Sequence, residues 1–193
     1  MRVIAGLAKR MPLAAPKGKN TRPTSDRAKE GLFNIIASHI ADSRFLDLFC
    51  GSGAIGIEAL SRGARLATFI DHCPKAIYAL KLNLEKTRLI QHAWYLCTKV
   101  DRAIEKFCKE KSQYDIIFLD PPYGEYLVTD TLSQIVKAGI LVDGGIIVAE
   151  TDTNIIDNIP SSLYLYDVRA YGLTNLCFMR WVPNSEICLS GEF

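Results

Sequence analysis

The tetrapeptide Asp-Pro-Pro-Tyr at residues 120–123 has the clearest chemical meaning in this sequence. It follows an almost continuous apolar run at residues 114–119, which predicts a buried strand. Proline has no backbone N–H, so a carboxylate and a carbonyl in this turn would present only acceptors. Such acceptors can hold the N–H groups of an exocyclic nucleobase amine and direct its lone pair at an electrophile. The predicted catalytic residues are Asp120, Pro121, Pro122 and Tyr123, with the tyrosine ring stacking on the base.

A second candidate site is the glycine-rich run DLFCGSGAIG at residues 47–56. Glycines allow a tight turn and close approach of backbone to a ligand, and a helix that begins there presents free N–H groups. Asp71, at the end of the next predicted strand, is placed to accept hydrogen bonds from ribose hydroxyls. The predicted cofactor-binding residues of these two segments are Asp47, Phe49, Cys50, Gly51, Ser52, Gly53, Gly56 and Asp71.

Three glycines of this run also satisfy the G-x-G-x-x-G pattern of dinucleotide-binding proteins. Asp47 discriminates between the ligands, because a carboxylate beside the loop would repel a diphosphate. It would suit the cationic amino-acid end of S-adenosylmethionine. A glycine turn without a ligand and a proline-rich turn that merely ends a strand are the structural alternatives for the two motifs.

These motifs need a scaffold that brings the ends of several strands together. From residue 44 onward, predicted strands alternate with predicted helices, a pattern typical of a parallel sheet covered on both faces. The strands are expected at 44–49, 66–70, 93–97, 114–119 and 145–149, and the helices at 54–61, 74–85, 100–109 and 127–138. Ligands of such sheets bind beyond the carboxyl ends of the strands, so the two motifs should lie side by side. Two further strands, at 163–170 and 176–182, are separated by only five residues and predict an antiparallel pair.

The amino-terminal segment differs from the rest of the chain in charge. Residues 1–30 hold eight basic and two acidic side chains, a net charge of +6, whereas the remainder carries −4. This distribution indicates a polyanionic partner, although a solvated terminus would show the same composition. We expect residues 1–24 to form a basic hairpin and arm, and residues 25–193 to form the main domain. A helix should begin at residues 25–26 and continue to about residue 40.

Other classes of protein are disfavoured by composition. No apolar run approaches the roughly 18–20 residues of a membrane span. The six cysteines include no C-x-x-C pair and the three histidines are scattered, which argues against a zinc site or a disulfide framework. Most of the cysteines lie beside apolar runs, as core residues do. We therefore expect a cytoplasmic protein with no metal and no membrane partner.

Together these motifs resemble the class I S-adenosylmethionine-dependent methyltransferases, and more narrowly the bacterial 16S rRNA guanine-N2 methyltransferase family RsmD. The resemblance extends over nearly the whole chain, at residues 2–6, 21–27, 31–34, 46–64 and 120–123. It implies a Rossmann-like α/β fold, with a seven-stranded, mostly parallel sheet, an antiparallel carboxyl-terminal hairpin and a small basic amino-terminal extension. The implied reaction is transfer of one methyl to N2 of guanine 966 of 16S rRNA, in the small ribosomal subunit.

The basic charge of the amino-terminal segment predicts the residues that contact RNA, and the resemblance implies one further cofactor contact. The residues expected to bind RNA are Arg2, Lys9, Arg10, Lys17, Lys19, Arg22, Thr24 and Arg27. An acid after the third strand should hold the adenine amine. Counting forward from the second helix places it near Thr98 or Lys99, whereas counting back from Asp120 favours Asp101, with an exposed acid at a helix start as the alternative. The chain departs from the family pattern at three positions, where it has Cys50 for alanine, Asp71 for glutamate and Tyr123 for phenylalanine.

Other functions remain open at this point. An adenine-N6 methyltransferase of DNA or RNA would use the same tetrapeptide, although 193 residues leave little room for a separate target-recognition domain. A catalytically inactive RNA-binding assembly factor would keep the fold but not the reaction. A nicotinamide-dependent oxidoreductase is disfavoured by Asp47. We expect a monomer.

Overall fold

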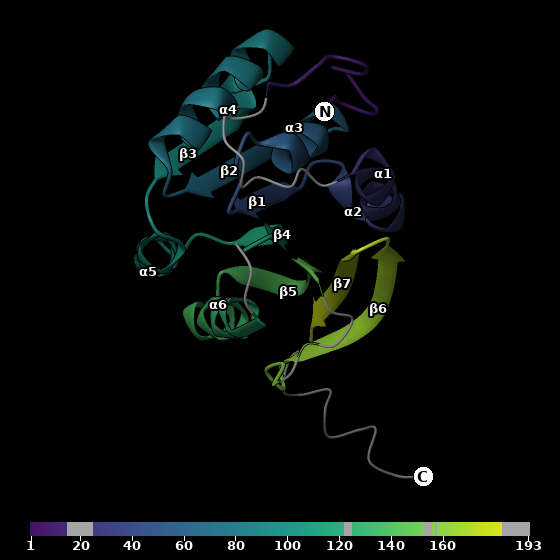
Figure 1. Cartoon of the computed structure of the whole chain (residues 1–193). Coiled ribbons are helices and arrows are strands. Elements are labelled where there is room, and N and C mark those ends of the chain that lie inside the picture. The colour runs from purple at the N-terminus through teal and green to yellow at the C-terminus, as the bar shows by residue number, and fades with distance from the viewer. Residues whose placement is uncertain (15–24, 122–124, 153–155, 157, 183–193) are drawn as a thin grey trace.

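The computed structural model describes residues 1–14, 25–121, 125–152, 156 and 158–182 (Figure 1). Its centre is a seven-stranded sheet in the order β3-β2-β1-β4-β5-β7-β6. The strands are β1 (Arg44–Leu48), β2 (Leu66–Asp71), β3 (Ala93–Cys97), β4 (Tyr114–Leu119), β5 (Leu141–Thr151), β6 (Leu163–Tyr171) and β7 (Thr174–Trp181). The first five strands are parallel, and β7 is antiparallel to both β5 and β6. The predicted Rossmann-like sheet with a reversed carboxyl-terminal pair is therefore confirmed.

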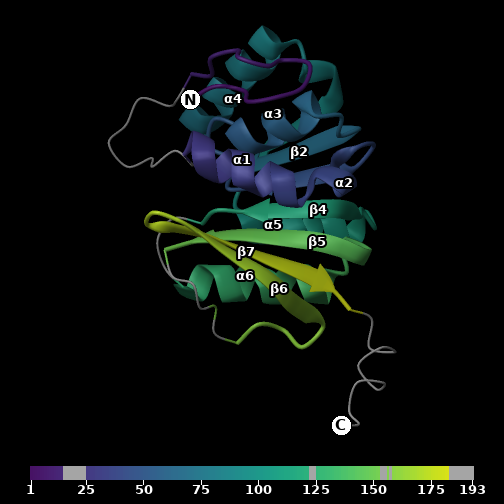
Figure 2. The same ribbon diagram turned by 90° about the vertical axis from the view of Figure 1, so that its right-hand side faces the viewer.

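Helices cover both faces of this sheet (Figures 1 and 2). They are α1 (Asp26–Ile35), α2 (Ala37–Ile40), α3 (Ala54–Ser61), α4 (Pro74–Thr87), α5 (Val100–Lys109) and α6 (Glu125–Ala138), with a short 3-10 turn at Ile90–His92. Successive residues of a strand point to opposite faces. Phe45 of β1 faces a core shared with α1, α3 and α4, whereas Leu46 and Leu48 face a core shared with α5 and α6. Alternating apolar strands thus build two cores, one on each face.

The predicted helix over residues 25–40 is interrupted. Ser25 caps α1 by accepting a hydrogen bond from the Ala28 N–H at 3.1 Å, as its sequence position predicted. Ile36 then leaves helical geometry, with φ of −93° and ψ of 10°, and α2 begins after it. The single helix expected here is therefore two.

The amino-terminal residues form the expected hairpin, and they pack on the body of the protein. An antiparallel bridge joins Arg2 to Pro12. The backbone N–H groups of Ile4 and Ala5 donate to the carboxylate of Glu58 on α3, at 2.7 and 2.9 Å. The apolar side chains that enter the core from this hairpin are Val3, Ala8 and Leu13. Residues 1–14 are thus held by the main core. The proposed boundary between residues 24 and 25 adjoins a segment outside the described residues.

A cluster of charged side chains links the hairpin to α1 and α3. Lys29 of α1 and Glu58 of α3 are 1% and 0% exposed, and their charged atoms lie 3.3 Å apart. Arg62, one turn after Glu58, donates to the same carboxylate at 2.8 Å. The Lys29 ammonium also donates to the carbonyl of Arg2. One carboxylate therefore organises α1, α3 and the hairpin.

Within the described part of the chain, no helix combines the length and apolarity needed to cross a membrane. The five described cysteines are all free thiols. Only Cys50 and Cys177 are buried, while Cys97 and Cys108 are exposed, so the expectation that most cysteines are core residues is wrong. Cys97 and Cys108 lie on exposed positions of β3 and α5, where apolar neighbours in sequence face the core.

Candidate cofactor-binding and catalytic site

The glycine loop between β1 and α3 turns through left-handed backbone. Phe49 has a φ of +64°, Gly51 of +54° and Gly53 of +81°. Such angles cost little for glycine but about 1–2 kcal/mol for phenylalanine. A Cβ on Gly53 would lie 2.2 Å from a methyl of Leu80, whereas one on Gly51 would meet nothing within 4 Å. Gly53 is therefore required by packing, and Gly51 marks the open side of the loop, where a ligand can approach.

Asp71 ties this loop to the end of β2. Its two carboxylate oxygens accept hydrogen bonds from the N–H of Gly51 at 2.9 Å and of Cys73 at 2.8 Å. The Cys50 N–H adds a bond of 2.8 Å to the carbonyl of Ile70. Each carboxylate oxygen has a second lone pair, so Asp71 retains acceptor capacity for hydroxyl groups of a ligand.

Asp47 lies under the loop and is 1% exposed. Its Oδ2 accepts from the N–H of Gly56 at 2.9 Å, which satisfies one of the free donors in the first turn of α3. Gly56 itself leaves no room for a side chain, since a Cβ there would lie 2.3 Å from the Phe69 ring. Burial raises the pKa of Asp47 to about 7, and the neighbouring charge of Asp71 adds to the shift. A cation bound beside Asp47 would relieve this cost.

Asp120 is placed where the sequence predicts, directly after β4. The parallel register pairs Leu119 with Ala149, so the next residues, Asp120 and Glu150, are neighbours on adjacent strands. Burial, followed by the charges of Glu150 and Asp47, raises the pKa of Asp120 to about 8. Asp120 is therefore a carboxyl group balanced between its neutral and charged forms near physiological pH.

Glu150 is a site residue that the sequence analysis missed. It is 9% exposed and lies near the carboxyl end of β5, which runs two residues further than predicted because it pairs with β7. An acid at the end of an apolar strand, next to the strand that leads into the Asp-Pro-Pro-Tyr segment, is a signal that could have identified it.

Four acids therefore meet at one edge of the sheet, each at or near the end of its strand: Asp71, Asp47, Asp120 and Glu150. Phe69, Phe118 and Val148 precede three of these acids by two residues and face the core of α1, α3 and α4. Strand alternation therefore directs the acids toward the same side. These carboxyl groups are hydrogen-bond acceptors, and they suit a ligand that has positive charge and hydroxyl groups. Among the residues that the structure describes, no three acidic, histidine or cysteine side chains are grouped to hold a metal ion.

Asn83 of α4 joins the glycine loop to the amino-terminal hairpin. Its side-chain amide donates to the carbonyls of Ser52 at 3.0 Å and Ala14 at 2.9 Å, and its oxygen accepts from the Ala14 N–H at 2.8 Å. Asn83 is 1% exposed and Ser52 is also buried. This link places the last described residue of the hairpin close to the candidate cofactor loop, a contact that sequence spacing does not reveal.

The remaining predicted residues differ in their surroundings. Asp101 is exposed in the first turn of α5 and its carboxylate accepts from the N–H of Arg102, so an adenine contact stays a prediction. Arg2 pairs with Asp26 at 3.2 Å. The Arg2 side chain is 63% exposed. Lys9, Arg10 and Arg27 are exposed as well, and Pro121 is buried. The predicted residues that lie outside the described part are Lys17, Lys19, Arg22, Thr24, Pro122 and Tyr123.

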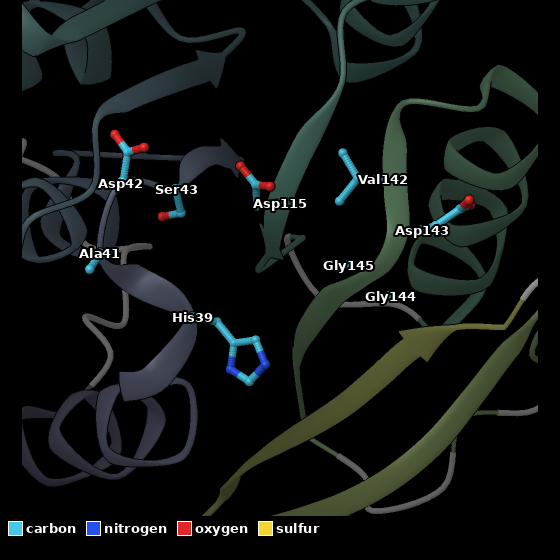
Figure 3. Close-up of a pocket in the computed structure, with 9 residues that line it drawn as sticks. All are labelled: His39, Ala41, Asp42, Ser43, Asp115, Val142, Asp143, Gly144 and Gly145. Atoms are coloured by element: carbon cyan, nitrogen blue, oxygen red, sulfur yellow. The ribbon is translucent and has the colours of Figure 1, made fainter.

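A separate open pocket lies at the opposite edge of the sheet (Figure 3). Its lining includes His39, Asp42, Asp115 and Asp143, whose side chains do not converge on one point (Figure 3). Asp115 accepts a bond of 2.7 Å from the N–H of Arg44, the first residue of β1. This pocket is formed by the starts of strands and contains none of the predicted site residues.

Comparison with known proteins agrees with this arrangement. The family model described as conserved hypothetical protein 95 matches residues 1–180. The chain is 39% identical over 181 residues to the candidate rRNA methyltransferase YlbH of Bacillus subtilis, covering 93% of this chain and 98% of that protein. It is 32% identical over 173 residues to ribosomal RNA small subunit methyltransferase D of Escherichia coli K12, covering 89% and 85%.

A solved structure of the candidate methyltransferase yhhF of Escherichia coli has the same fold, with a TM-score of 0.82 at 32% identity. The match covers 94% of this chain and 97% of that one. The resemblance seen in the sequence is thereby confirmed, and the chain belongs to the conserved hypothetical protein 95 family, which includes the bacterial ribosomal RNA small subunit methyltransferases D.

Proposed function

We propose that this protein transfers a methyl group from S-adenosylmethionine to the exocyclic N2 of a guanine in 16S rRNA. The observation that carries the proposal is the position of Asp120, half-buried beyond β4 beside Glu150 and one strand from the glycine loop. The names of the relatives support an rRNA substrate in the small ribosomal subunit. Guanine 966 is the target that the sequence resemblance implies.

The acids at the strand ends fit the proposed cofactor. When bound, S-adenosylmethionine supplies a methyl group on a positively charged sulfur. Asp71 would accept from its ribose hydroxyls, and Asp47 would face its amino-acid end, while the open side of Gly51 lets the backbone approach. The carboxyl groups of Asp47 and Asp120 have raised pKa values, and a nearby cation would stabilise their charged forms.

Asp120 would act on the amine of the base. Its carboxylate and the carbonyl of Pro121 would accept the two N–H groups, which favours a nitrogen lone pair directed at the methyl group. As the new N–C bond forms and the S–C bond breaks, the nitrogen must lose a proton. A carboxylate with a pKa near 8 is a suitable acceptor for it at neutral pH.

The test compares ribosomal RNA from cells with and without this protein. Mass mapping of nucleosides should find one N2-methylguanosine absent from the small-subunit RNA of the deficient cells. The purified protein should restore it on isolated small subunits, and Asp120→Asn should not. Restoration of N6-methyladenosine would point instead to the adenine reaction, and an unchanged nucleoside profile to an inactive assembly factor.

Asp47→Asn should stabilise the protein without cofactor and weaken cofactor binding. The folded state holds the Asp47 proton more tightly than the unfolded state, so stability falls as pH rises from about 4 toward 7. Asparagine keeps the acceptor for the Gly56 N–H but cannot ionise. At pH 8 we expect urea denaturation to give on the order of 3 kcal/mol more stability than wild type, and less difference at pH 5.

Calorimetry should find weaker S-adenosylmethionine binding by the same variant. Asp42→Asn is the control, since that carboxylate is 82% exposed. Its stability should stay within about 0.5 kcal/mol of wild type at both pH values. A change in the stability of Asp47→Asn that is the same at pH 5 and pH 8 would contradict the assigned cause.

Basic amino-terminal residues should contribute to RNA affinity in a salt-dependent way. Three double glutamine variants compare the described pair Lys9 and Arg10, the pair Lys17 and Lys19, and the control pair Lys109 and Lys111 near the end of α5. Each lost phosphate contact should reduce the slope of log K against log salt by about 0.7–0.9. An unchanged slope for the first two variants, measured by filter binding, would remove these residues from the RNA interface.

A further inference from the structure

The turn between β6 and β7 stands at the same edge of the sheet as the four acids. Because β7 runs antiparallel to β5, its first residues lie at the carboxyl end of β5, and the register pairs Glu150 with Leu176. Leu173 precedes Leu176 by three residues. It therefore lies about 10 Å further than Glu150 in the direction in which β5 ends. Figure 2 shows this turn projecting past the ends of the neighbouring strands.

The turn is short and anchored. Tyr171 pairs with Thr174, so only Gly172 and Leu173 form the tip, and Gly172 has a φ of +68°. The Tyr171 ring packs against α1, where a Cβ on Gly31 would lie 1.8 Å from the tyrosine oxygen. The hairpin tip is thus held in place by a helix as well as by its own strand pairing.

The tip is apolar, and the helix that anchors it carries an exposed positive charge. Leu173 is 73% exposed, whereas the next residue, Thr174, is buried. Arg27 is exposed on α1 one turn before Gly31, and residues four apart share a helix face. An exposed leucine and an exposed guanidinium on two elements that contact each other suit RNA, in which apolar base faces alternate with phosphates.

We propose that Leu173 packs against a nucleobase adjacent to the target nucleotide, with Arg27 on the phosphate backbone, and so keeps the target base unstacked over Asp120. This inference rests on the proposed function. Two strand spacings separate β4 from β7, so the tip lies on the order of 14 Å from Asp120. At that distance Leu173 meets a flanking nucleotide rather than the reacting amine. Enzymes that modify bases extrude them from the stack, and inserted apolar side chains are one way to hold the gap.

The test measures kcat/KM for methylation of isolated small subunits. Leu173→Ala should lower it by about 10- to 100-fold, the equivalent of exposing a leucine that wild type buries. Leu173→Met, of similar volume, should restore most of the rate. Tyr164→Ala is the control, because Tyr164 is 62% exposed on the same hairpin at the end of β6 opposite the tip, and it should behave as wild type. The affinity for S-adenosylmethionine should be unchanged in all three variants.

A second readout follows the base itself. In an RNA fragment with 2-aminopurine at the target position, wild type should raise the fluorescence by unstacking that base, and Leu173→Ala should raise it much less. Wild-type rates and fluorescence for Leu173→Ala, or an equal loss for Tyr164→Ala, would overturn the inference. Failure of wild type to methylate small subunits would overturn the proposed function instead.

Discussion

Asp120→Ala is expected to reduce methyl transfer by about 10²–10³-fold, the usual cost of removing one group that stabilises a transition state. Cofactor binding should remain within about fivefold of wild type. Burial already leaves the Asp120 carboxyl largely neutral before ligands bind, so its removal takes little charge from the empty site. Single-turnover methylation and calorimetry separate the two effects.

Asp120→Asn gives a finer comparison. The amide keeps one acceptor oxygen but cannot take a proton, so this variant should lose the reaction at every pH. Wild-type rates with both substrates well below saturation should rise with pH up to about 8, where the carboxyl of the free enzyme ionises. A pH profile that is flat between 6 and 9 would contradict a role for the ionised carboxylate.

Glu150→Gln tests the origin of that pH dependence. The charge of Glu150 is the second cause of the raised pKa of Asp120, after burial. Its neutralisation should move the rise in rate to lower pH without abolishing the reaction. Asp42→Asn, on an exposed carboxylate at the other edge of the sheet, should leave the profile unchanged. Near-normal activity of Asp120→Ala would refute the catalytic role of the tetrapeptide.

The sequence predicted the scaffold well because its elements are locally encoded. Apolar runs such as residues 114–119 indicate buried strands, and Pro74 begins α4 as expected of a residue without an N–H. The ends of strands were less predictable. β5 extends to Thr151 because β7 pairs with it, and that pairing joins residues about 25 positions apart. Glu150 was missed for this reason.

The charge of the amino-terminal segment is a second feature that depends on contacts between residues distant in sequence. Lys29 contributes to the +6 of residues 1–30, yet it is buried against Glu58, and Arg2 pairs with Asp26. Neither role follows from composition, because the partner of Lys29 is 29 residues away. Fewer of the described basic residues are therefore available to bind a polyanion than their number in the sequence indicates. The available ones include Lys9, Arg10 and Arg27.

Glu58→Ala should cost about 3–5 kcal/mol of folding free energy, as expected when one partner of a buried ion pair is removed. The variant leaves Lys29 without its anion at a site that is 1% exposed. It also removes the acceptor of the Ile4 and Ala5 N–H groups. Urea denaturation followed by circular dichroism gives the loss. Glu110→Ala, which breaks the exposed pair with Lys106, is the control and should cost less than about 0.5 kcal/mol.

A double variant separates the charge from the hydrogen bonds. Glu58→Ala with Lys29→Met removes both buried charges, so it should be more stable than Glu58→Ala alone. The amides of Ile4 and Ala5 should still exchange faster than in wild type, because no acceptor returns. A loss below 1 kcal/mol for Glu58→Ala would mean that the hairpin is held by its apolar side chains alone. Fast exchange of these amides in a protein that otherwise remains folded would establish that Glu58 fixes the hairpin beside the glycine loop, through the contact that Ala14 makes with Asn83.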